Sequence, residues 1–218
     1  MKRFAVIGLG NFGFHAAKAL YEEGNEVVAI DLNKARVQAI DAYCSEAIVL
    51  EATDKEALKA LGLENMDGVI VSTGTKISTS ILICLYLQEI GVQKILVKAL
   101  DEDHEKILKR VGATDVIHPE RDMAVRTSRG LSSPNMLDFV PISDEFDLVQ
   151  IGPPREFIGK TLRELNLRAK YNVHIIAIHE IVPENFRLVP PPDFVIKDSD
   201  ILIMLGKTED IRKIKGLK

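Results

Sequence analysis

Short apolar runs alternate with amphipathic segments over the first 118 residues of the chain. The apolar runs, rich in β-branched residues, cover 3–8, 26–31, 47–50, 68–73, 94–98 and 115–118, and the amphipathic segments cover 12–23, 34–43, 54–61, 77–90 and 103–111. Strands that are apolar along their whole length are typical of a sheet covered on both faces. The alternation therefore predicts an α/β fold, a Rossmann-like doubly wound parallel sheet.

The pattern changes after residue 118. A helix is expected over 120–131, and the Ser-Ser-Pro-Asn cluster at 132–135 predicts a turn or hinge. Further on we expect strands over 146–151, 173–181 and 201–205, short helices over 161–166 and 209–214, and an extended connection at the prolines 190–192. We therefore predict two domains, residues 1–138, including the helix 120–131, and a small α+β domain of residues 139–218.

Charge and composition exclude several classes of protein. The 218 residues carry 28 Lys and Arg against 32 Asp and Glu, a net charge of −4, which argues against binding to nucleic acid or directly to anionic lipid. Two cysteines cannot make a disulfide framework. The most apolar stretch, 81–87, is too short to cross a bilayer, and the N-terminus shows no signal-peptide pattern. We expect a cytoplasmic protein that reaches a membrane only through a partner.

A G-x-G-x-x-G motif joins the first predicted strand to the first helix. Gly8 permits the tight turn, Gly10 lets a pyrophosphate approach the backbone, and Gly13 allows the helix to pack closely on the strand. The helix N-terminus offers N–H groups to the phosphates. Asp31 ends the next strand, 18 residues after Gly13, where a carboxylate accepts hydrogen bonds from ribose hydroxyls. The combination predicts a nucleotide site and makes NADP the least favoured dinucleotide.

The nucleotide could be a redox cofactor or a signal, and the sequence favours a signal. A hydride-transfer enzyme needs an acid or base beside the nicotinamide. His104 falls on a charged helix that we expect to be exposed, and His174 and His179 are expected on opposite faces of one strand. No residue is therefore assigned as catalytic. A small NAD-dependent oxidoreductase is the alternative, and a redox-sensing transcriptional regulator would need a basic helix-turn-helix that neither half supplies.

Beyond the glycine motif, the chain resembles a known family along its whole length. In the N-terminal half the likeness is carried by residues 8–13, 27–33, 51–54, 67–72, 97–99 and 116–120. This half resembles the RCK domains that regulate potassium conductance, above all those of Ktr/Trk-type potassium-uptake regulators. The stretches 157–162, 167–171 and 198–200 are similar to the small TrkA-C domain that follows the TrkA-N domain in that family.

The resemblance implies a non-enzymatic regulatory subunit. Members of the family form dimers that assemble into octameric rings, homomeric or mixed, under the cytoplasmic face of a membrane-embedded potassium translocator. They bind ATP, ADP, AMP or NAD(H) in their N-terminal domains and gate the flow of potassium. The resemblance therefore implies a cytoplasmic protein that lies at the inner face of the plasma membrane through its transporter partner.

The same resemblance assigns binding residues one by one. It implies that Gly8, Gly10 and Gly13 hold phosphates, Asp31 the ribose, Asn33 the adenosine side, Glu51, Ala52, Thr53 and Thr73 the adenine end, and Lys98 and Ala99 the crevice floor, with Asn11, Phe12, Leu32 and Gly74 as further cofactor-binding neighbours. Glu120 matches the position that the family associates with a divalent or monovalent cation at the dimer contact.

Some positions depart from the family pattern. Asn11 stands where many ATP-responsive members have an Arg that reaches the terminal phosphates, which leaves ADP, AMP or NAD(H) open beside ATP. Glu51 stands where Asp is commoner. Some relatives bind cyclic di-AMP between their C-terminal domains; Arg168 and Ile175 match that region, whereas His174 replaces a commoner Asn.

Overall fold

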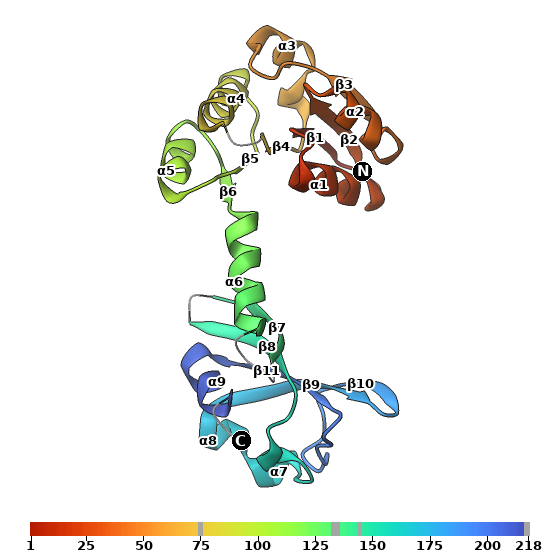
Figure 1. Ribbon diagram of the computed structural model, residues 1–218, viewed down its shortest axis with the longest axis vertical. Coiled ribbons are helices and arrows are strands. Elements are labelled where there is room, and N and C mark those ends of the chain that lie inside the picture. Colours follow the sequence, from red (N-terminus) through yellow and green to blue (C-terminus); the bar gives the residue numbers. More distant parts are fainter. Residues whose placement is uncertain (74–75, 132–135, 144, 216–218) are drawn as a thin grey trace. The chain divides into compact units, whose positions relative to one another are not determined.

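The computed structural model describes residues 1–73, 76–131, 136–143 and 145–215. The chain divides into two compact units, Met1–Glu120 and Arg121–Lys218, which are treated separately below (Figure 1). The predicted turn or hinge at 132–135 lies outside the described residues.

The first unit is built on a parallel sheet of six strands in the order β3-β2-β1-β4-β5-β6. The strands are β1 (Arg3–Ile7), β2 (Glu26–Asp31), β3 (Glu46–Val49), β4 (Gly68–Val71), β5 (Ile95–Lys98) and β6 (Asp115–Ile117). Chain order reverses between β1 and β4, which is where open α/β sheets of this kind bind their ligands. The predicted fold class is confirmed.

Helices cover both faces of this sheet (Figure 1). They are α1 (Asn11–Glu22), α2 (Lys34–Ile40), α3 (Lys55–Ala60), α4 (Ile77–Ile90) and α5 (Glu102–Arg110), with short 3-10 turns η1 (Asp41–Tyr43) and η2 (Leu63–Asn65). Val6 of β1 packs with buried residues of α1 and α2, whereas its neighbours Ala5 and Ile7 point into the core shared with α3, α4 and α5. The strands β1, β2, β3 and β4 thus contribute alternate residues to two cores, which explains the apolar runs in their sequences.

The starts of three of these helices follow from their capping residues. The side chains of Asn33, Asp54 and Asp101 accept backbone N–H bonds at the first turns of α2, α3 and α5. One helix, α6 (Pro119–Leu131), begins in the first unit and continues into the second. Proline is favoured at such a first position because its missing N–H has no intrahelical partner there.

The second unit contains an antiparallel sheet of five strands in the order β10-β9-β11-β8-β7. Its elements are β7 (Met136–Pro141), β8 (Phe146–Ile151), η3 (Arg155–Phe157), α7 (Leu162–Leu165), α8 (Leu167–Tyr171), β9 (Val173–Ile181), β10 (Glu184–Leu188), β11 (Ile201–Lys207) and α9 (Thr208–Lys215). The predicted α+β character holds. Residues 136–141 and 184–188, for which we expected no strand, form the two edge strands β7 and β10, and the predicted boundary near 138 falls within β7.

The expectation that His174 and His179 face opposite ways is wrong. His174 pairs with Leu205 of β11 and His179 with Ile201, but the register shifts between them, so that β9 carries one extra residue opposite β11. Such a bulge changes the alternation of side chains. Because Leu205 and Ile201 are four residues apart on β11, both histidines lie on the same face of the sheet.

The close packing in the β1–α1 turn yields a stability prediction. A Cβ at Gly13 would lie 1.9 Å from the carbonyl oxygen of Gly8, whereas a Cβ at Gly10 meets nothing within 4 Å. Gly13→Ala is expected to lower the free energy of unfolding by about 1–3 kcal/mol or more, since the turn must open to admit the methyl group. Gly10→Ala, at φ −67° and ψ −173°, is the matched control and should stay within about 0.5 kcal/mol. Urea unfolding measures both, and equal stabilities would show that the turn relaxes freely.

Candidate functional site

The turn between β1 and α1 exposes the N-terminus of α1. Gly8 has φ +94°, and a Cβ there would lie 2.5 Å from the carbonyl oxygen of Ser72, so that glycine is required on steric grounds. Gly10 is the N-cap of α1, and among the described residues no side chain caps this helix or places a carboxylate in its first turn. The N–H groups of that turn lack intrahelical partners and are suited to an anion.

A crevice of about 380 Å³ opens at the carboxyl ends of β3, β2, β1 and β4. This volume falls within the roughly 300–1,000 Å³ that is usual for small-molecule sites. Six of the residues that the sequence singled out line it: Gly8, Asp31, Leu32, Glu51, Ala52 and Thr73. Gly10, Asn11, Phe12 and Gly13 lie at the adjoining start of α1.

Asp31 ties the two sides of this crevice together. Its Oδ2 accepts the backbone N–H of Leu9 at 2.7 Å, and its Oδ1 accepts the N–H of Asn33 at 2.7 Å. The guanidinium of Arg36 lies 3.4 Å from Oδ2. Each carboxylate oxygen has two lone pairs, so these bonds leave capacity for a hydroxyl donor. The Asn33 side chain caps α2, where its Oδ1 accepts hydrogen bonds from two backbone N–H groups.

The crevice lining includes two basic side chains that the sequence analysis did not single out. They are Arg36 on α2 and Lys76 at the N-cap of α4. Both are suited to a phosphate-bearing ligand. A signal for Arg36 was present, because a residue in the first turn of a helix that follows Asp31 must lie near the carboxyl end of β2. Lys76 carried a similar signal, because it lies between the predicted strand 68–73 and the predicted helix 77–90, near the carboxyl end of β4.

The wall of the crevice contains one polar atom without a partner. The hydroxyl of Thr73 is buried and makes no hydrogen bond to any described residue. A buried hydroxyl in that state is costly unless another group satisfies it. Together with the uncapped start of α1 and the open space at Gly10, it fits a polar, anionic ligand in this crevice. Gly74, the next predicted residue, lies outside the described part of the chain.

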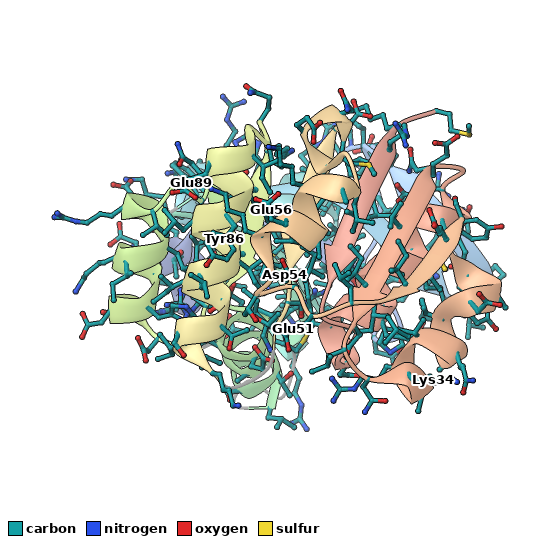
Figure 2. The ribbon with its side chains drawn as sticks, turned by 90° about the horizontal axis from the view of Figure 1, so that it is seen from above. Lys34, Glu51, Asp54, Glu56, Tyr86 and Glu89 are labelled. Carbon is teal, nitrogen blue, oxygen red and sulfur yellow. The ribbon has the colours of Figure 1, made fainter. Side chains whose placement is uncertain are left out.

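Glu51 and Thr53 form the far end of the site, in the loop between β3 and α3. The Glu51 carboxylate accepts both the hydroxyl of Thr53, at 2.7 Å, and its backbone N–H, at 3.3 Å. Figure 2 shows Glu51 in the middle of this unit, close to Asp54 at the start of α3. Both bonds from Thr53 go to Oε1, so the second oxygen of Glu51 can accept a hydrogen bond from an exocyclic amine.

Lys98 and Ala99 are not part of the crevice lining as the described residues define it. The Lys98 ammonium lies 2.7 Å from Oε1 of Glu120, and this hydrogen bond lowers the pKa of Glu120. Ala99 is buried, and its N–H donates to the carbonyl of Ile117. In this structure Lys98 therefore supplies the positive charge that a cation at Glu120 would have to replace.

His118 and Glu105 form a second polar pair at the end of β6. Nε2 of the buried His118 lies 2.7 Å from Glu105, whose other oxygen pairs with Lys109 at 2.7 Å. The hydrogen bonds from Lys109 and His118 lower the pKa of Glu105 to about 2. His118 is thus held by Glu105, which also pairs with Lys109 on the same helix α5.

The second unit has a shallow groove of about 240 Å³ beside α8. Arg168, His174 and Ile175, the residues singled out for a second ligand, all line it, together with Arg163 and the prolines Pro190 and Pro192. Its mixture of two guanidinium groups with flat apolar surfaces suits an anionic, aromatic ligand.

No group of three or more His, Cys, Asp or Glu side chains within the described ranges is arranged to hold a metal ion. None of the helices in the described part of the chain is long and apolar enough to cross a membrane.

Two family models match the chain in the same order as its two units. The TrkA-N domain matches residues 4–119, and the TrkA-C domain matches residues 148–217. The first match covers the whole parallel sheet with its crevice, and the second covers most of the antiparallel sheet.

Curated relatives align with nearly the full length of the chain. It is 44% identical over 214 residues to Ktr system potassium uptake protein C of Bacillus subtilis, covering 98% of this chain and 96% of the relative. It is 38% identical over 215 residues to Ktr system potassium uptake protein A of the same bacterium, with coverages of 99% and 96%. Identity to the Ktr system potassium uptake protein A of Vibrio alginolyticus is 33%, with coverages of 99% and 98%.

Solved structures support the fold. The GsuK RCK domain superposes on 99% of this chain with a TM-score of 0.68 at 16% identity, and the chain spans about half, 48%, of that longer structure. The AMP-bound Kef C-terminal domain of Shewanella denitrificans covers 61% of this chain and 79% of its own, with a TM-score of 0.52 at 20% identity. With the two family models and the relatives above, the chain belongs to the TrkA-N/TrkA-C family, the family of the Ktr system potassium uptake proteins.

Proposed function

We propose that this chain is the nucleotide-binding regulatory subunit of a potassium uptake system. The observation that carries the proposal is a ligand-sized crevice that Gly8 and Asp31 line, directly beside a start of α1 that no described side chain caps. The names of the three relatives given above, Ktr system potassium uptake proteins C and A, support potassium uptake as the process that the chain serves.

The residues of the crevice suit the parts of an adenine nucleotide or NAD(H). Phosphates would lie against the first turn of α1, where Gly10 leaves the backbone open. Ribose hydroxyls would donate to Asp31, and the adenine amine to Glu51, while the methyl-rich walls of Ile7, Ile30 and Leu50 would contact the base. Asp31 leaves little tolerance for a 2′-phosphate, which is why NADP is the least suited of these ligands.

Asn11 bears on which nucleotide acts as effector. It is exposed at the first position of α1 and offers an amide where an Arg would offer a charge. Positive charge comes instead from Arg36 and Lys76, the only Lys or Arg residues among the described crevice residues. This arrangement favours ADP, AMP or NAD(H) as the effector, because their phosphates would lie near the backbone. It is less suited to an ATP that is recognised through its γ-phosphate. A fold neighbour, GsuK, is described as an NAD-bound channel.

The chain would act on a partner rather than on a substrate. We propose that it works at the cytoplasmic face of the membrane, as dimers assembled into an octameric ring against a membrane-embedded potassium translocator. A nucleotide that binds one ring conformation more tightly shifts the population toward it. A coupling of about 1–3 kcal/mol changes that equilibrium by roughly 5- to 150-fold. The proposal includes a cation bound at Glu120, at the contact between the two chains of a dimer.

A hydride-transfer enzyme is the less favoured function. Such an enzyme needs a proton donor or acceptor beside the nicotinamide. The described crevice residues include no histidine, cysteine or tyrosine, and their acidic members, Asp31 and Glu51, already accept backbone N–H groups. This composition supports a binding role without catalysis.

The nucleotide site is tested by isothermal calorimetry with ATP, ADP, AMP, NAD⁺ and NADH. Gly10→Ala places a methyl group where the phosphates approach and is expected to reduce affinity at least 10-fold without loss of stability. Asp31→Ala removes the ribose acceptor and should also reduce affinity at least 10-fold, with some loss of stability because Leu9 and Asn33 lose their partner. Unchanged affinity in both variants would exclude the crevice as the site.

A second ligand is proposed for the groove beside α8. Its arginines and its match to the family position support cyclic di-AMP, and Arg168→Ala is expected to weaken binding of cyclic di-AMP at least 10-fold. Lys170→Ala, an exposed cation on the same helix outside the lining, is the control. Calorimetry that gives the same affinity for both variants would remove Arg168 from that site.

Regulation itself is tested by potassium flux. A Ktr-type translocator in liposomes is loaded with the chain, and uptake of Rb⁺ is measured with and without nucleotide. Nucleotide is expected to change the flux by a factor within roughly 5 to 150. Gly10→Ala serves as the control, because it should bind the translocator but lose the response. Flux that is the same with and without the chain would contradict the proposed function.

A further inference from the structure

His104 is buried, although its helix carries charges on most of its length. Its side chain is 2% exposed, so the expectation of a surface histidine is wrong. The reason is the i, i+4 spacing of His104 and Leu108, which places both on the inner stripe of α5, while Glu102, Asp103 and Lys106 lie outside. A buried imidazole that the proposed nucleotide site does not use requires partners.

One tautomer of His104 satisfies every hydrogen bond around it. The backbone N–H of Leu100 donates to Nδ1 at 3.2 Å, so Nδ1 carries a lone pair. Nε2 lies 2.9 Å from the hydroxyl of Ser80, which itself donates to the carbonyl of Ile77 at 2.9 Å. Nε2 must therefore hold the proton and donate it to Ser80. The neutral imidazole joins the segment after β5 to the first turn of α4.

The first turn of α4 is part of the nucleotide crevice. Lys76 and Thr79 line the crevice, and Ser80 follows Thr79 directly. Among the described residues, no side chain caps α4, so its first turn has few polar attachments of its own. The other end of the bridge is firm, because the N–H of Ala99, next to Leu100, donates to Ile117 of the neighbouring strand.

We propose that His104 is a positioning residue for the nucleotide site: through Ser80 it fixes the first turn of α4, and with it the crevice groups of Thr79 and Lys76. This role rests on the proposed nucleotide binding. It gives the crevice a buried support on the β4–β5 side, opposite the support that Asp31 gives on the β1–β2 side.

The state of the imidazole sets a pH dependence. Burial lowers the pKa of His104 below its ordinary value of 6.5; Asp101, at the start of α5, raises it, and His118, at the end of β6, lowers it further. A group with a lowered folded-state pKa stabilises the fold fully above 6.5 and loses that contribution as the pH falls through the folded-state value. Protonation removes the acceptor for Leu100, so both stability and nucleotide affinity should decline in that window.

The bonds can be removed one at a time in the full chain. Ser80→Ala deletes the contact to α4, and His104→Asn keeps an acceptor near Nδ1 but cannot reach Ser80. Both are expected to lower NAD⁺ and ADP affinity by about 3- to 10-fold. His104→Gln places an amide near Nε2 and should retain affinity within about 2-fold. The double variant Ser80→Ala/His104→Asn should lose no more affinity than either single variant, because both substitutions remove the same hydrogen bond between Ser80 and His104.

Controls separate positioning from general destabilisation. Cys84→Ala, a buried change one turn further along α4 with no hydrogen bond to His104, should lower the melting temperature but leave affinity unchanged. NAD⁺ affinity of the wild type should fall as the pH is lowered from 8 to below 6.5, and that of His104→Gln should change less. If Ser80→Ala and His104→Asn both keep the nucleotide affinity of the wild type, the positioning role is overturned. It is also overturned if the loss of affinity across the variants only follows their loss of melting temperature. Failure of the wild type to bind any of the five nucleotides would instead overturn the proposed function on which it rests.

Discussion

The hydrogen bonds of Asp31 hold the site together. One carboxylate accepts the N–H of Leu9 in the β1–α1 turn and the N–H of Asn33 at the start of α2. These bonds connect two βα turns that are adjacent in space and separated in sequence. They also fix the direction in which the carboxylate faces the crevice. The same group thus shapes the β1–α1 turn and faces the crevice, so under the proposed function it would serve the phosphate end and the ribose of a nucleotide in one fixed geometry.

The turn that Asp31 stabilises depends on the absence of side chains. Gly13 lies so close to the carbonyl of Gly8 that no Cβ fits, and this contact seats α1 directly on the end of β1. The first turn of α1, which no described side chain caps, therefore begins beside Gly8 at the edge of the crevice. With no Arg at position 11, the electrostatic attraction to phosphate comes from the backbone, from Arg36 and from Lys76. In the proposed function an anion would therefore be held mainly at the glycine turn, rather than far along a phosphate chain.

The first unit was predictable from the sequence because its physical constraints act locally. A strand buried on both faces must be apolar throughout, and the helices α2 and α3 start at the capping residues Asn33 and Asp54. In the second unit those constraints weaken. The edge strand β10 is mostly exposed and reads as a polar segment, and the bulge in β9 depends on its pairing with β11, which no local pattern records. The same holds for β7, whose place at the sheet edge is set by β8.

In the site, the sequence indicated residues at the carboxyl ends of the strands, Thr73 after β4 among them, and missed the basic side chains Arg36 and Lys76 and the α4 residue Thr79. Gly8, Asp31 and Glu51 each follow a strand of the half β1–β3, whereas Lys76 and Thr79 enter from α4 across the point where chain order reverses. A ligand in this crevice therefore touches both halves of the sheet. Binding free energy can favour one arrangement of those halves only if the two arrangements present different contacts. The side that needs support for this purpose is the α4 side, since its contribution comes from an uncapped helix end rather than from a sterically locked glycine turn.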